Sequence, residues 1–139
     1  MLLTPKRWKF RKQHVKPLSG KSVRGSYISF GDMGLKAVTS GYLSNKQLEA
    51  ARKVVVRHTR KVGQIRFRVF PNTPITKKGL EMPMGTGKGD VDHYAAAVRK
   101  GKIIFEVSGL AEEDARKVLI SAGKKLSVRT RVVLKGEVR

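Results

Sequence analysis

A chain of 139 residues with 40% hydrophobic residues is long enough for one domain with a real core, and we expect one domain rather than two. Its 31 lysines and arginines against 10 acidic residues give a net charge of +21, which suits a polyanion: nucleic acid or, as the alternative, an anionic membrane surface. The lack of cysteine excludes disulfides, thiol catalysis and cysteine-ligated metal, and no apolar run approaches the length of a membrane span.

The charge is uneven along the chain, and the first residues are the most basic. Residues 1–70 hold 17 basic and 2 acidic residues, whereas residues 71–139 hold 14 and 8. Residues 1–24 are predicted to form a basic N-terminal extension, in which cations meet phosphates while aromatic rings stack on RNA bases. The alternative is a disordered, solvated tail. The residues expected to bind RNA here are Lys6, Arg7, Trp8, Lys9, Phe10, Arg11, Lys12, His14 and Arg24.

Residues 25–139 are predicted to form a single α+β RNA-binding domain, beginning with two short strands. Strand-forming residues recur over 23–30, and a second strand is expected over 35–38. A turn at 31–34 separates the two, and Gly41 is the predicted end of the second strand.

The clearest predicted element is a helix that begins at Ser44. Ser44 and Gln47 have the spacing of a capping box, and Gly63 is the predicted helix end. The predicted buried stripe comprises Leu48, Ala51, Val55 and Val62. The other faces are basic, which favours RNA binding, although a solvated face near the negative end of the helix dipole explains the same pattern. The residues expected to bind RNA from this helix are Arg52, Lys53, Arg57, Arg60 and Lys61.

A strand is predicted over residues 64–70, because apolar and polar residues alternate there. Its apolar side is expected to face the helix. Arg66 and Arg68 lie on the second side, where they are either solvated or bound to phosphate, and we count them among the expected RNA contacts.

Residues 71–90 are predicted to form one extended Gly/Pro-rich loop. Residues 70–90 hold three of the five prolines and four of the fourteen glycines, and no apolar period runs through them. Connections this long are usually functional or disordered. Glycines let backbone amides approach phosphates, lysines add charge, and methionines add adaptable apolar contact. A mobile surface loop without a partner is the alternative.

The rest of the chain is predicted to contain a hairpin, a second helix and a last strand. Residues 91–99 and 102–107 flank Lys100-Gly101 with the spacing of a two-residue turn. Acidic residues at 112–114 suit the positive end of a helix, and residues 128–135 alternate as a strand. The stripe of the second helix is predicted to be Ala115, Val118, Leu119 and Ala122. The sum is an α+β fold, an antiparallel sheet with two helices packed against it.

No catalytic constellation is apparent, so we expect no enzyme, no cofactor and no metal site. Residues 85–90 fail the P-loop pattern, because Gly89 stands where Ser or Thr is needed. Asp90, Asp92 and His93 leave one enzyme hypothesis open, a metal-dependent RNA-processing activity, but no separated His or Glu completes a ligand set. A free-standing general nucleic-acid binder is a third hypothesis.

Several ordered motifs, taken together, resemble one family nearly end to end. The chain opens with Pro5-Lys6-Arg7 and Lys9-Phe10-Arg11-Lys12, and continues with Phe30-Gly31, Gly34-Leu35-Lys36-Ala37 and Glu49-Ala50-Ala51-Arg52. The loop region adds Arg68-Val69-Phe70-Pro71, Pro74-Ile75-Thr76, Met84-Gly85 and Gly87-Lys88-Gly89. These residues resemble the bacterial-type large-subunit ribosomal protein L-sixteen (uL-sixteen) family.

The resemblance implies an α/β-hammerhead-type domain that binds large-subunit rRNA and supports late subunit assembly. It implies A-site and P-site tRNA near the peptidyl-transferase region and neighbouring large-subunit ribosomal proteins as partners, with no membrane. The expected location is the ribosome, in the cytoplasm or an organelle matrix. The tRNA-proximal residues that match the family's loop are Lys77, Lys78, Met82, Met84, Gly85, Thr86, Gly87, Lys88 and Gly89.

Two loop positions depart from the family pattern. The family often has Arg where Pro83 stands and Lys where Thr86 stands, so two cations near tRNA are replaced here. A contact or modification that depends on that Arg does not carry over.

Overall fold

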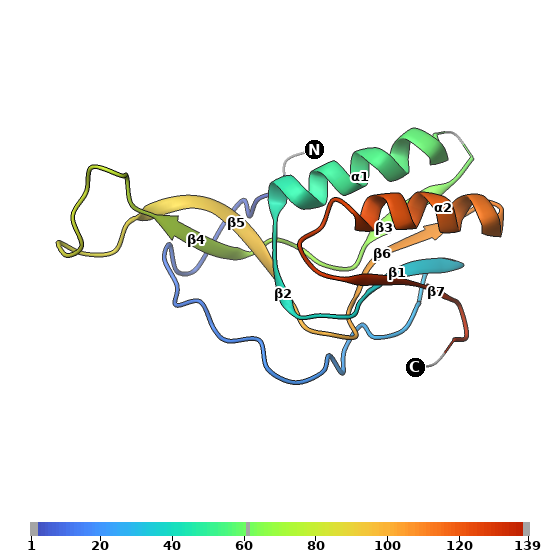
Figure 1. Ribbon diagram of the computed structural model, residues 1–139, viewed down its shortest axis with the longest axis horizontal. Coiled ribbons are helices and arrows are strands. Elements are labelled where there is room, and N and C mark those ends of the chain that lie inside the picture. Colours follow the sequence, from blue (N-terminus) through green and yellow to red (C-terminus); the bar gives the residue numbers. More distant parts are fainter. Residues whose placement is uncertain (1–2, 61, 138–139) are drawn as a thin grey trace.

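The computed structural model describes residues 3–60 and 62–137, in which two helices pack with antiparallel sheets (Figure 1). This arrangement confirms the predicted α+β class. The elements, in chain order, are β1 (Met33–Ala37), β2 (Gly41–Ser44), α1 (Asn45–Thr59), β3 (Gln64–Phe67), β4 (Thr73–Lys77), β5 (Asp90–Val98), β6 (Ile103–Ser108), α2 (Glu112–Gly123) and β7 (Thr130–Leu134).

A four-stranded sheet forms the centre of the body, with strand order β3-β6-β1-β7 and every neighbour antiparallel. Helices α1 and α2 lie side by side against one face of it (Figure 1). Leu35 and Phe105 of the sheet and Leu48 and Leu119 of the helices are at most 1% exposed. Phe67 meets Phe105 edge to face, with ring centroids 4.9 Å apart. The core therefore lies between the helices and this sheet.

A second sheet, of order β2-β5-β4, continues from the body into an arm. The two strands β4 and β5 extend to one end of the molecule, and the loop of residues 78–89 joins them at the tip (Figure 1). The single predicted sheet is therefore two sheets.

The prediction that residues 71–90 contain no strand was wrong, because β4 lies within them. Proline lacks the N–H that a central strand needs, and Pro74 lowers the strand signal for that reason. In the structure β4 is the edge strand, with Pro74 opposite Tyr94 of β5. The edge position tolerates the proline, and the irregular part of the connection shortens to residues 78–89.

The predicted hairpin around Lys100-Gly101 was also wrong, because β5 and β6 belong to different sheets. Gly101 does have a positive φ of 91°. Its N–H, however, bonds the Ala37 carbonyl at 2.7 Å, and Ala37 N–H bonds the Lys102 carbonyl at 2.8 Å. The turn thus sends the chain from one sheet to the other, where β6 pairs with β1 and β3.

The first predicted strand, over residues 23–30, is irregular in the structure. Its polar backbone groups bond elsewhere: the Gly25 carbonyl accepts from Ile103 N–H at 2.8 Å, and the Glu106 carboxylate accepts the N–H groups of Ser29 and Phe30. The predicted turn at 31–34 overlaps β1, which begins at Met33, and Gly41 begins β2 instead of ending a strand.

Helix α1 begins as predicted, and the capping box is confirmed. Ser44 Oγ accepts from Gln47 N–H at 3.2 Å, and Gln47 Oε1 accepts from Ser44 N–H at 3.1 Å. The helix ends at Thr59 rather than Gly63, with Arg60 at φ 39°. Val62 therefore lies outside the stripe and is 79% exposed, which corrects that prediction.

Helix α2 confirms its predicted stripe and acidic first turn. Ala115, Val118, Leu119 and Ala122 are all buried against the core, and residues 112–114 stand at the positive helix end. The last predicted strand is shorter at both ends than residues 128–135, since β7 spans Thr130–Leu134.

Candidate RNA interface

The first segment of the chain lies along the arm, although its residues belong to no helix or named strand between 3 and 32. Lys12 Nζ donates to the Lys88 carbonyl at 3.0 Å and approaches Asp90 Oδ1 at 3.4 Å. Lys88 Nζ donates in return to the Gln13 carbonyl at 2.6 Å. Tyr42 Oη donates to the Lys16 carbonyl at 2.6 Å. The bonds of Lys12 and Lys88 join the basic segment to the base of the loop, and the bond of Tyr42 joins it to β2.

Apolar residues hold the beginning of this segment, while its cations face outward. Leu3 is 5% exposed and belongs to the core, and the Trp8 ring lies 6.5 Å from that of Tyr94. Trp8 remains half exposed. The expected RNA-binding residues that the structure leaves exposed in this segment are Lys6, Arg7, Lys9, Phe10, Arg11, His14 and Arg24, with Lys12 at intermediate burial.

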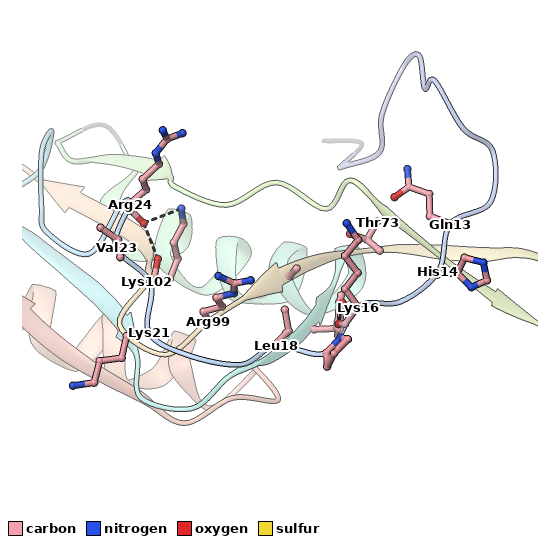
Figure 2. Close-up of a pocket in the computed structure, with 14 residues that line it drawn as sticks. Gln13, His14, Lys16, Leu18, Lys21, Val23, Arg24, Thr73, Arg99 and Lys102 are labelled. Carbon is pink, nitrogen blue, oxygen red and sulfur yellow. Dashed lines mark hydrogen bonds between the residues drawn. The ribbon is translucent and has the colours of Figure 1, made fainter.

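A basic groove of about 520 Å³ lies where the segment returns beside β5 (Figure 2). The described residues that line it include no Asp or Glu. Lys102 Nζ donates to the Arg24 carbonyl at 3.3 Å, and Ser22 Oγ donates to the same oxygen at 2.7 Å. The Lys and Arg residues of this groove are Lys16, Lys21, Arg24, Arg99 and Lys102.

Arg99 and Lys102 belong to this surface, although the sequence patterns did not predict them. The two residues stand on either side of the turn that follows β5, and the first segment reaches them only through tertiary structure: Lys21 bridges Lys100, more than seventy positions away. Local sequence signals do not reveal such a contact. The excess of Lys and Arg at 99–102 was the only available sign.

The basic residues of α1 lie away from this groove. The helix C-terminus points to the end of the molecule opposite the loop (Figure 1). Lys53 is exposed along the helix, and Arg57 and Arg60 are exposed at its C-terminal end. Arg52 instead forms a fork with Glu49, at 2.6 and 3.0 Å, and the Arg52 hydrogen bond lowers the pKa of that carboxyl. Lys61 lies outside the described residues.

Arg66 and Arg68 meet the exposed ring of Phe30, with guanidinium carbons 5.5 and 5.1 Å from its centroid. Arg68 Nη1 also donates to Glu106 Oε1 at 2.5 Å. Burial raises the pKa of Glu106, but the N–H groups of Ser29, Phe30 and Gly31 together with Arg68 outweigh that effect, and the pKa lies below its ordinary value. Arg68 is thus paired, with an 18% exposed side chain.

Glu106 was not predicted from the sequence to have a role in this surface. A lone carboxylate inside the apolar run of residues 103–107 was the available signal, since a buried charge requires partners. Its three backbone donors come from residues 29–31, which the sequence analysis had assigned to a strand end and a turn.

The loop of residues 78–89 presents backbone and side chains to solvent. Gly85, Thr86 and Gly87 have positive φ angles of 115°, 59° and 96°, which glycine adopts without steric cost and threonine rarely adopts. Lys78 Nζ donates to the Gly85 carbonyl. The expected tRNA-proximal residues that are exposed are Lys77, Met82, Met84, Gly85, Thr86, Gly87 and Lys88, with Lys78 and Gly89 at intermediate burial.

Asp90, Asp92 and His93 do not form one cluster in the structure, because the two carboxylates have different partners. His93 Nδ1 lies 2.7 Å from Asp92 Oδ2, and this hydrogen bond lowers the pKa of Asp92. Asp90 faces Lys12 instead. Within residues 3–60 and 62–137, no three His, Asp or Glu side chains are placed to hold a metal ion.

The fold and its surface define a small, basic α+β protein that presents cations along an ordered segment, a groove and an arm. No helix within the described part of the chain combines the length and apolarity needed to cross a bilayer. Comparison with known proteins identifies a family within this class. Residues 5–133 match the family described as ribosomal protein L16p/L10e.

Two relatives illustrate the similarity. The large ribosomal subunit protein uL16 of Thermus thermophilus is 46% identical over 132 residues, covering 95% of this chain and 94% of the relative. The large ribosomal subunit protein uL16 of Staphylococcus aureus is 43% identical over 136 residues, covering 98% and 94%. The chain belongs to the ribosomal protein L16p/L10e family, a family of structural, non-enzymatic proteins. The family predicted from the sequence motifs is confirmed.

Proposed function

We propose that this protein is a structural constituent of the large ribosomal subunit, located in the ribosome and bound to large-subunit rRNA. The observation that carries the proposal is the family match over residues 5–133, with relatives named as large-subunit proteins at 43–46% identity. The net charge of +21 supports it, because rRNA phosphates neutralise such a charge. The cytoplasm is the proposed compartment, as for a bacterial-type ribosome.

Within this role, residues 1–24 serve as a basic rRNA-binding extension of the domain formed by residues 25–139. Their exposed cations and half-exposed Trp8 support this, because RNA is bound through both phosphates and stacked bases. The basic groove beside β5 adds a second phosphate-binding surface, with Arg99 and Lys102 as contacts. Lys53 and Arg57 of α1, with Arg60 at its C-cap, contact rRNA or a neighbouring ribosomal protein at the other end of the molecule.

Lys77, at the end of β4, and the loop of residues 78–89 lie near A-site and P-site tRNA and support tRNA positioning. Its place at the tip of an arm supports this role, since an arm reaches beyond the surface on which the body docks (Figure 1). Lys77 and Lys88 supply charge, and the open backbone at Gly85 and Gly87 allows close approach to phosphates. Pro83 and Thr86 make the tip less basic than the family pattern.

A shortened loop tests this assignment. Residues 79–87 are replaced by Asn-Gly, which keeps Lys88 and its bond to the Gln13 carbonyl, because the antiparallel strands β4 and β5 can close through a loop of two or three residues. The variant is expected to enter large subunits at the wild-type level, while binding of A-site tRNA to the purified ribosomes weakens. The full-length protein, prepared in parallel, is the control. Failure of the shortened protein to enter subunits, or unchanged tRNA binding, would contradict the assignment of the loop.

A further inference from the structure

Phe30 has an exposed ring, but its backbone is fixed by hydrogen bonds to a buried carboxylate. Its residue is 61% exposed, yet its backbone N–H donates to Glu106 Oε2 at 2.7 Å. The flanking N–H groups of Ser29 and Gly31 donate to the same carboxylate at 3.1 and 2.9 Å. Glu106 is completely buried. An irregular segment is thereby fixed on the sheet at the residue that carries the exposed aromatic ring.

The same carboxylate also holds one of the two arginines beside the ring. Arg68 donates to Glu106 Oε1 at 2.5 Å and places its guanidinium 5.1 Å from the Phe30 centroid. Arg66, which stands opposite Glu106 in the β3–β6 register, places its guanidinium 5.5 Å from that centroid and is itself exposed. One buried carboxylate therefore holds the Phe30 backbone and the Arg68 guanidinium, and Arg66 lies beside the same ring.

We propose that Phe30, Arg66 and Arg68 form a stacking platform for a single unpaired RNA base, and that Glu106 is its positioning residue. Unpaired bases stack on aromatic rings and on guanidinium planes, and the exposed charge of Arg66 suits an adjoining phosphate, whereas Arg68 is paired with Glu106. A protein ligand is less suited, because the cluster offers planar faces and cations at one point rather than an apolar patch. The inference rests on the proposed rRNA binding and adds to it a base contact that the charge pattern does not supply.

The test measures the affinity of the full-length protein for in vitro transcribed large-subunit rRNA at fixed salt. Phe30→Leu is expected to lower the affinity by about 5- to 150-fold, which is the range for losing one stacked base. Phe30→Trp, which keeps a ring, is expected to retain wild-type affinity. Phe70→Leu is the matched control, because Phe70 is also about half exposed but lies outside the cluster, and it should change the affinity less than twofold.

The positioning role of Glu106 is tested by a double-mutant cycle on variants that circular dichroism shows to be folded. Glu106→Gln should lower the affinity, and adding Phe30→Leu should lower it little further, because the platform is already displaced. Independent losses that multiply would overturn the positioning role.

Two failures are distinguishable. If the wild-type protein does not bind the rRNA, the proposed function itself fails. If it binds and Phe30→Leu binds equally well, only the platform is refuted. Ultraviolet cross-linking adds a direct readout: residue 30 of the wild type should join one nucleotide, and the absence of any cross-link from residues 29–31 would overturn the proposal.

Discussion

Replacing Glu106 by Gln removes one negative charge from a site where four donors converge. Oε1 accepts from Ser29 N–H and Arg68, and Oε2 accepts from the N–H groups of Phe30 and Gly31. Glutamine keeps only one of the two acceptor oxygens. In either orientation of its amide, two of the donors face an NH₂ group, and Arg68 keeps its charge beside a neutral side chain.

The free energy of unfolding should fall by about 3 to 5 kcal/mol, the usual cost of removing one partner from a buried ion pair. Urea unfolding at pH 7, followed by the helical circular dichroism signal, measures it. Glu112→Gln makes the same change in an exposed pair with Arg116, 3.5 Å apart, and should cost about 0.5 kcal/mol. A loss in Glu106→Gln no greater than in this control would refute the reasoning.

The difference between wild type and Glu106→Gln should also depend on pH. The folded protein lowers the pKa of Glu106 below that of the unfolded chain. Its contribution to stability is therefore present above the unfolded pKa, ordinarily about 4.3, and is lost as the pH falls through the lowered folded value. Unfolding curves from pH 7 downward should converge for the two proteins, and a gap that stays constant into strong acid would count against the lowered pKa.

Three further predictions concern the core, the helix cap and the docking charges. Ser44→Ala should cost about 1 kcal/mol in urea unfolding, because the first turn of α1 loses its capping acceptor; an unchanged midpoint would contradict this. Leu119→Ala should cost about 2 to 5 kcal/mol in the same assay, whereas Ile120→Ala, at a 48% exposed position, should cost far less. Lys9→Gln should reduce the slope of log affinity for rRNA against log salt by about 0.7 to 0.9, and Lys117→Gln on α2 should leave it unchanged; equal effects would refute the assigned surface.

Local signals were sufficient for the two helices but not for the pairing of the strands. The capping box of Ser44 and the stripe at Leu48, Ala51 and Val55 depend on residues within a few positions of each other, and both are confirmed. The partners of β6 are instead β1 and β3, far away in the chain, so the spacing around Gly101 suggested a hairpin that does not form.

Some parts of the candidate site could be predicted from local sequence signals, whereas others depend on tertiary contacts. The charge excess that marks residues 6–24 is visible in the sequence, and those cations are largely exposed. The groove with Arg99 and Lys102, and the clamp by which Glu106 holds Phe30, depend on a segment that folds back across the sheet. A sequence that alternates weakly over 23–30 does not reveal that path, because the segment forms no strand ladder and its backbone instead bonds Ile103 N–H and the Glu106 carboxylate.

Sedimentation of the tagged protein from its native host tests the ribosomal assignment most directly. The lysate is run through a sucrose gradient with and without ribonuclease treatment, and the protein is located by its tag. Co-migration with large subunits, abolished by ribonuclease, is the expected result for stable rRNA docking. A protein that stays at the top of both gradients would contradict a role as a structural constituent of the large subunit.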